Sequence, residues 1–171
     1  MRAIDAANFF IDVCAKSPDR DYMTNLRLHK LLFYAQGWSL VLRGAPLFGD
    51  VVEAWQSGPV VPAVFGELRI NGKNPIMEPA KGYSESDVSD EDAQFLIDVL
   101  VHHESSLAFG LVDLTRTLPC WRNHQYRNED IPLDEIRADF ETLTPRLATL
   151  SERVQRMPVS HGIPLSEDFD E

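Results

Sequence analysis

A helix that is apolar on almost every side dominates the sequence between residues 25 and 43. One face repeats at helical spacing through Leu28, Leu31, Leu32, Ala35, Trp38 and Leu42. Phe33, Tyr34, Gly37, Leu40 and Val41 cover most of the opposite side, so that the polar strip consists of His29, Gln36 and Arg43. A helix of this kind is usually buried, and we expect it to be the central element of the fold. Thr24 or Asn25 can cap its start, and Gly44 is suited to end it.

The remaining segments predict a mainly helical fold. Apolar residues at helical spacing indicate helices over residues 3–16, 107–118, 133–143 and 147–154, with two more starting at Pro62 and after Ser89. Val51, Val52, Ala54 and Trp55 predict a short strand that ends at Ser57-Gly58-Pro59. Residues 76–77 predict a second strand that pairs with the first. We therefore expect about six to seven helices with a small β hairpin or sheet.

Length and composition favour one domain. A chain of 171 residues can bury a proper core. No internal repeat or long linker divides it, so we expect a helical domain over residues 1–156 and a disordered acidic tail over residues 157–171. No apolar run is long enough to span a membrane, and no signal segment opens the chain. These features predict a cytoplasmic protein without membrane attachment.

The charge is strongly negative, with 27 Asp and Glu against 16 Lys and Arg and a formal net charge of −11. Direct contact with nucleic acid needs clustered basic residues, which the sequence lacks. The acidity fits a chain that binds a basic partner, and it fits equally well a chain whose charge only maintains solubility.

Two sequence segments resemble the Panacea domain family, which occurs in SocA-like antitoxins and in phage-associated GepA-like proteins. The first is Thr24-Asn25-Leu26-Arg27-Leu28-His29-Lys30-Leu31-Leu32-Phe33-Tyr34-Ala35-Gln36-Gly37-Trp38. The second is Pro46-Leu47-Phe48 followed by Glu53-Ala54-Trp55-Gln56-Ser57-Gly58-Pro59-Val60-Val61-Pro62. Their order and spacing match the family pattern, and the resemblance extends over roughly residues 24–121, more than half of the chain.

Three positions depart from that pattern. Arg116 stands where the family usually has a histidine, Cys120 separates Pro119 from Trp121, and His29 replaces a common glutamine. A role that depends on the missing histidine is therefore not expected here.

The resemblance implies a Panacea-type domain that acts as an antitoxin by binding a cognate toxin protein. One alternative is a phage- or mobile-element-associated interaction protein, such as an adaptor that delivers a client to an ATP-dependent protease. Another is an enzyme with a pocket near Lys30, Tyr34 and Trp55. The sequence shows no motif for a catalytic residue or a cofactor, so we expect no enzymatic activity.

Lys30 is the polar residue that most needs explanation, because it lies on an apolar face of the central helix. An ammonium group in that position is costly unless it is paired. Glu53 and Glu67 are the candidate partners in a structural ion pair. Residues that could contact a partner protein are Lys30, Tyr34, Trp55, Gly58, Pro59, Val60 and Trp121. Gly58 and Pro59 predict a rigid corner between the strand and the next helix.

Neither the cysteines nor the histidines predict a metal site. Cys14 and Cys120 are too few and too far apart for a zinc site or a disulfide framework. His102 and His103 are adjacent on a predicted helix, so their side chains point about 100° apart and do not share an ion readily. We expect His103 to face inward and His102 to be exposed.

Overall fold

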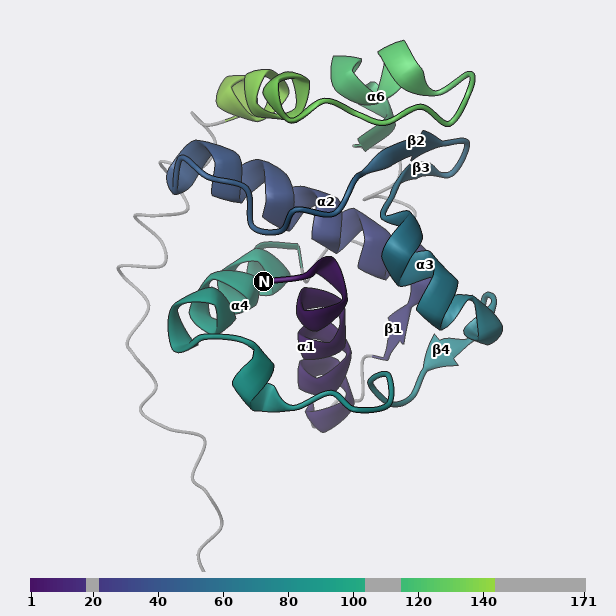
Figure 1. Ribbon diagram of the computed structural model, residues 1–171, viewed down its shortest axis with the longest axis vertical. Coiled ribbons are helices and arrows are strands. Elements are labelled where there is room, and N and C mark those ends of the chain that lie inside the picture. Colours follow the sequence, from purple (N-terminus) through teal and green to yellow (C-terminus); the bar gives the residue numbers. More distant parts are fainter. Residues whose placement is uncertain (18–21, 104–114, 144–171) are drawn as a thin grey trace, which may run out of the picture.

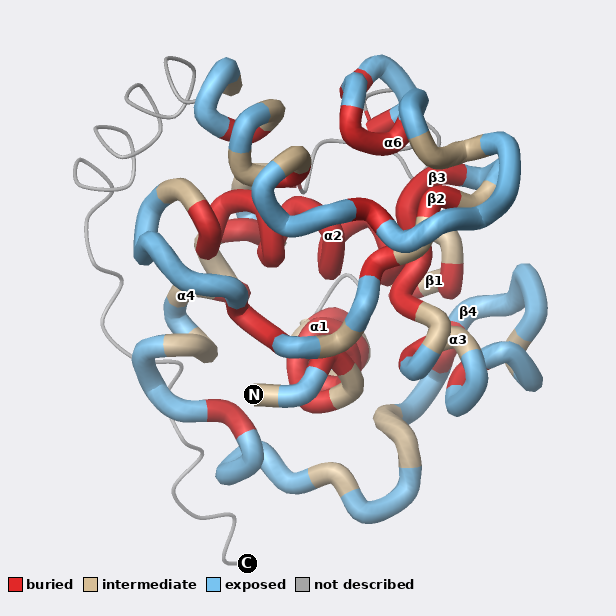
Figure 2. Tube along the Cα trace, turned by 45° about the horizontal axis from the view of Figure 1, so that its top comes forward, coloured by how far each residue is buried: buried red, intermediate tan, exposed pale blue. Residues whose placement is uncertain are grey.

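The computed structural model describes residues 1–17, 22–103 and 115–143, and the helix α2 (Asn25–Leu42) lies at its centre. Fifteen of its 18 residues are buried, as Figure 2 shows along the length of the tube. The Thr24 side chain accepts a hydrogen bond from the backbone N–H of Arg27, and Gly44 follows the helix with φ +72°. The predictions of a buried central helix, a threonine cap and a terminating glycine are confirmed.

Helices cover α2 from two sides (Figure 1). On one side lie α1 (Ala3–Lys16) and α4 (Asp90–His103), which contact α2 and each other. On the other side lie α6 (Pro119–His124) and a helix over residues 133–143. The latter inserts Phe140 against α2, with its ring 4.7 Å from that of Trp38 and 5.6 Å from that of Tyr34. The mainly helical fold predicted from the sequence is thus confirmed.

The β structure consists of two small antiparallel pairs. Strands β2 (Glu53–Trp55) and β3 (Gly58–Val60) form a hairpin, and β1 (Met23–Thr24) pairs with β4 (Pro75–Ile76). The prediction that residues 76–77 pair with the first strand is wrong. Gln56 and Ser57 turn the chain back on itself, so the Gly58-Pro59 segment predicted to end the strand becomes its partner. The buried Ile76 pairs instead with Met23.

Shorter elements complete the fold. Helix α3 (Pro62–Leu68) begins with a proline at its first turn and continues into the 3-10 helix η1 (Arg69–Asn71). A second 3-10 turn, η2 (Glu85–Asp87), precedes α4. Residues 115–117 are helical, and α6 starts after Leu118. The rest of the helix predicted over 107–118, the helix predicted over 147–154 and the tail over 157–171 lie outside the described residues.

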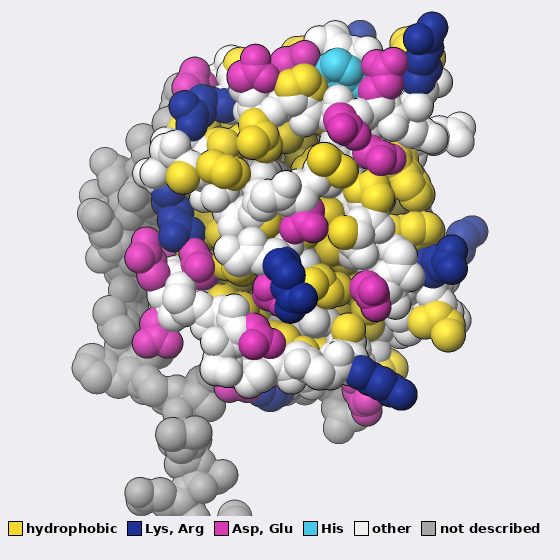
Figure 3. Space-filling model, viewed as in Figure 1, with side chains coloured by type: hydrophobic (Ala, Val, Ile, Leu, Met, Phe, Trp, Pro, Cys, Tyr) yellow, Lys and Arg dark blue, Asp and Glu magenta, His cyan; other side chains and the backbone are white. Residues whose placement is uncertain are grey.

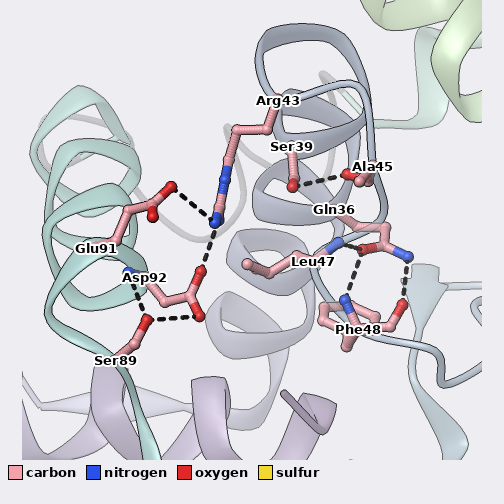
Figure 4. A network of polar contacts seen from close by, with 9 residues as sticks. All are labelled: Gln36, Ser39, Arg43, Ala45, Leu47, Phe48, Ser89, Glu91 and Asp92. Atoms are coloured by element: carbon pink, nitrogen blue, oxygen red, sulfur yellow. Dashed lines mark hydrogen bonds and ion pairs between the residues drawn. The ribbon is translucent and has the colours of Figure 1, made fainter.

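Two of the three residues in the polar strip of α2, His29 and Gln36, are buried. The Gln36 side chain accepts hydrogen bonds from the backbone N–H groups of Leu47 (2.8 Å) and Phe48 (3.2 Å), and donates one to the Phe48 carbonyl (3.0 Å). Figure 4 shows this amide facing the loop. A buried amide that satisfies three backbone groups fastens the Pro46–Phe48 segment to the central helix.

In the part of the chain that the structure describes, no helix combines the length and the apolar character that crossing a bilayer requires.

Gly37 and Gly66 provide a matched test of packing around α2. A Cβ at Gly37 would lie 2.4 Å from two ring carbons of Phe140, whereas one at Gly66 in α3 would meet nothing within 4 Å. We expect Gly37→Ala to lower the free energy of unfolding by about 1–3 kcal/mol, because overpacking outweighs the gain in helix propensity. Gly66→Ala should raise it by about 0.5–1 kcal/mol. Urea denaturation measures both, and a Gly37→Ala protein as stable as the wild type would contradict this packing.

Candidate functional site

The structure brings most of the sequence-predicted site residues together where the hairpin meets α2. The Lys30 side chain is 0% exposed, and its ammonium donates a hydrogen bond of 2.9 Å to the Pro59 carbonyl. One residue earlier on the helix, His29 Nδ1 accepts a hydrogen bond of 3.3 Å from the backbone N–H of Val61. Two neighbouring side chains of α2 therefore hold the strand β3 and its exit into α3.

The expected ion pair of Lys30 with Glu53 or Glu67 is wrong, although Lys30 is fully buried. Glu53 instead accepts a hydrogen bond of 2.6 Å from Trp55 Nε1, and Glu67 is exposed on α3. Among the described residues the acceptor for the Lys30 ammonium is the Pro59 carbonyl. The reason is the hairpin, which returns β3 across α2 and places a backbone oxygen where a carboxylate was expected.

Burial changes the charge states of Lys30 and His29. Loss of solvent, with a smaller contribution from the charge of Arg116, lowers the pKa of Lys30 to about 7. Burial and the charge of Lys30 likewise lower the pKa of His29 to about 3. The imidazole is therefore neutral at physiological pH, which agrees with its role as an acceptor at Nδ1.

Gly58 is required by close approach as well as by backbone conformation. It adopts φ +103°, and a Cβ at this position would lie 2.8 Å from Cε and Nζ of Lys30 and 3.2 Å from Oγ1 of Thr115. The sequence predicted a corner in the backbone at Gly58 but not the close approach of Lys30 and Thr115. Thr115 is fully buried, and the sequence offers no signal that it joins this cluster.

The tryptophans link the hairpin to α6. Trp121 is buried and donates a hydrogen bond of 2.9 Å from Nε1 to the backbone carbonyl of Trp55. The Arg116 guanidinium lies 5.5 Å from the centroid of the Trp121 ring. Trp55 is partly exposed and packs edge-on against Phe65 at 5.0 Å between centroids.

Tyr34 does not join this cluster. It is buried beside Phe140 and His103, with the His103 ring 4.2 Å away. As expected, His103 is buried, whereas His102 is only partly buried rather than exposed.

The candidate partner-contact residues are therefore mostly internal. Lys30, Tyr34, Gly58, Pro59, Val60 and Trp121 are all buried, while Trp55 alone of the seven is partly exposed. Of the seven, Trp55 is therefore the residue that a partner of the folded domain can reach, and Lys30, Gly58, Pro59, Val60 and Trp121 lie in the buried layer around the hairpin.

A hollow of about 510 Å³ lies away from this cluster, between the end of α2 and the start of α4. Met1, Ser39, Arg43, residues 45–47, Glu91 and Asp92 line it. The Arg43 guanidinium binds Asp92 at 2.7 Å and Glu91 at 3.2 Å, and Figure 4 shows these contacts joining the two helices. The two carboxylates neutralise the Arg43 guanidinium, and these ion pairs link the end of α2 to the start of α4. None of Lys30, Tyr34 and Trp55 lines this hollow, so it is not the pocket that the enzyme alternative places near them.

No metal-binding constellation was found among residues 1–17, 22–103 and 115–143. Cys14 and Cys120 are buried and form no disulfide.

Comparison with known proteins gives a family match over the same elements. The model for the family described as antitoxin SocA-like, Panacea domain, matches residues 28–122, from α2 to α6. Over 58 residues the chain is 43% identical to the protein named Antitoxin SocA from Caulobacter vibrioides (strain NA1000 / CB15N). That alignment includes 34% of this chain and 31% of the relative, so it spans less than a third of the relative's length. No solved structure matches.

The charge state of Lys30 generates a prediction. The unfolded chain binds a proton at Lys30 up to an ordinary pKa near 10.5, whereas the folded chain releases it from about pH 7. The unfolded state thus binds more protons in this window, so the stability of the fold rises with pH across it. Lys30→Met removes this contribution. We expect the stability of the wild type relative to Lys30→Met to increase by about 3–5 kcal/mol from pH 6.5 to 10.

Urea denaturation of the two proteins at several pH values measures this difference, and groups that titrate in both proteins cancel. A stability difference that stays constant over the window would show that Lys30 keeps an ordinary pKa in the fold.

Proposed function

Because this chain belongs to the SocA-like Panacea domain family, we propose that it is an antitoxin that neutralises a toxin by binding to it directly. The observation that carries this proposal is the family match over residues 28–122, which includes α2, the hairpin and α6. Within that span, Lys30, His29 and Gln36 all bind backbone groups of the same chain. The polar residues of the motif thus build a scaffold, as a binding module requires.

A catalytic role for the motif has less support. Lys30 has a lowered pKa, which is often a mark of a functional site. Its ammonium, however, is fully buried against the Pro59 carbonyl. A reacting group must reach its substrate, and this one faces the interior of the fold. We therefore propose a non-enzymatic protein, which acts in the cytoplasm where its toxin is made.

Co-expression with the product of the neighbouring reading frame tests the proposal. Expression of that product alone should arrest growth, and co-expression of this chain should restore growth and yield a complex that co-purifies. His102→Gln should restore growth as well as the wild type does, since His102 lies on α4 and not on the hairpin. Lys30→Met should restore growth to the extent that it still forms the complex. Failure of the wild type to restore growth, with no complex formed, would contradict the antitoxin role.

The same strains separate binding from catalysis and from proteolysis. Loss of rescue by Lys30→Met while the complex persists would point to a chemical mechanism. Neutralisation by binding leaves the amount of toxin unchanged, so disappearance of the toxin together with dependence on an ATP-dependent protease would contradict binding alone.

A further inference from the structure

Glu53 and Asp130 lie directly opposite each other across an isolated antiparallel bridge. The flanking hydrogen bonds run from the Ala54 N–H to the Glu129 carbonyl (2.9 Å) and from the Ile131 N–H to the Val52 carbonyl (2.7 Å). This pattern places Glu53 and Asp130 at a non-hydrogen-bonded position, where opposite side chains share a face and approach most closely. The fold therefore places the side chains of two acidic residues next to each other on one face of β2.

No described cation neutralises this pair. The two basic residues that precede Asp130 most closely in the chain, His124 and Arg127, both lie against Glu129, at 3.4 and 3.9 Å. Within residues 1–17, 22–103 and 115–143, neither Glu53 nor Asp130 takes part in an ion pair with Lys, Arg or His. Like charges directly opposite each other destabilise a β pair, so the pair carries a repulsion that an external cation would relieve.

An aromatic side chain adjoins these carboxylates. Trp55 lies two residues from Glu53 on the same face of β2, and its Nε1 donates to a Glu53 carboxylate oxygen at 2.6 Å. The ring is partly exposed and rests against the partly exposed Phe65. The hydrogen bond from Trp121 to the Trp55 carbonyl holds the backbone beneath it. The indole is thus a fixed apolar platform. On the face of the molecule in Figure 3, acidic side chains lie beside hydrophobic ones at the upper end.

We propose that Glu53, Asp130 and Trp55 form a docking face for an arginine side chain of the protein that this chain binds. The inference rests on the proposed function, and it names the chemistry of the partner. A planar guanidinium can donate to two carboxylates at once and stack on an indole, whereas an ammonium is a compact point charge. A net charge of −11 favours the approach of such a basic partner.

A titration of the full chain tests the docking face without the toxin. The probe is Nα-acetyl-arginine N-methylamide, and the readout is the NMR signal of each indole N–H of the three tryptophans, with Trp55 assigned through Trp55→Phe. The Trp55 signal should shift saturably with the arginine probe, less with the lysine analogue, and not with the uncharged citrulline analogue. Equal shifts with arginine and citrulline would overturn the proposal.

The double variant Glu53→Gln/Asp130→Asn supplies the matched test. Glutamine at residue 53 keeps an acceptor for Trp55 Nε1, so the fold should persist with an unchanged or higher melting temperature. The control is Glu78→Gln/Glu141→Gln, which removes the same charge from two exposed carboxylates elsewhere. The first variant should abolish the Trp55 shift, and the control should retain it. A shift that survives in the first variant would overturn the proposal.

The toxin complex then separates this inference from the function on which it rests. Glu53→Gln/Asp130→Asn should weaken the complex by at least about tenfold and reduce its dependence on salt, while the control stays within about twofold of the wild type. If the wild type and the double variant neutralise and bind equally, the docking face is wrong and the antitoxin role stands. If the wild type neutralises nothing, the antitoxin role fails and the titration alone decides whether the face binds arginine.

Discussion

The burial of α2 on nearly all sides is the constraint on which the rest of the fold depends. Eighteen residues at the centre of a small domain leave little room for polar side chains to reach water. Gln36, His29 and Lys30 therefore find their partners in the backbone of the segments that cover the helix. A buried polar group without a hydrogen bond is costly, so each of these contacts holds its covering segment against the helix.

These contacts explain how an internal motif can shape a surface. Lys30 and His29 hold β3 from below, and Trp121 holds the backbone of Trp55. The hairpin is thereby held in place, with Trp55 and Glu53 partly exposed and Asp130 exposed beside them. A pre-ordered surface loses little conformational entropy when a partner binds, which suits a domain whose proposed role is to capture another protein.

The parts of the fold that depend on local sequence pattern could be predicted from the sequence. The bounds of α1, the start of α3 at Pro62 and the central position of α2 follow from periodicity and from capping or turn residues. The partner of Lys30 could not be predicted in this way, since a backbone carbonyl has no sequence signature and is positioned only by the hairpin. The sequence marks His29 and Gln36 as the polar strip of α2, but a pattern records only that a side chain is polar and not what it binds.

The opposition of Glu53 and Asp130 is a second feature beyond the reach of the sequence. It depends on the pairing of two segments far apart in the chain, and an error of one residue in register would reverse the face of each side chain. The family resemblance identifies the hairpin as part of the motif, yet Asp130 lies outside the matched residues 28–122.

Native-state hydrogen exchange tests the central claim most directly. If buried side chains of α2 hold the covering segments, the amides of Leu47, Phe48 and Val61 should exchange only through unfolding that approaches the global transition. In Gln36→Leu, the amides of Leu47 and Phe48 should lose protection while that of Val61, held by His29, keeps its protection relative to the global stability. Rapid exchange of Leu47 and Phe48 in the wild type, or equal loss at all three amides in the variant, would contradict the account.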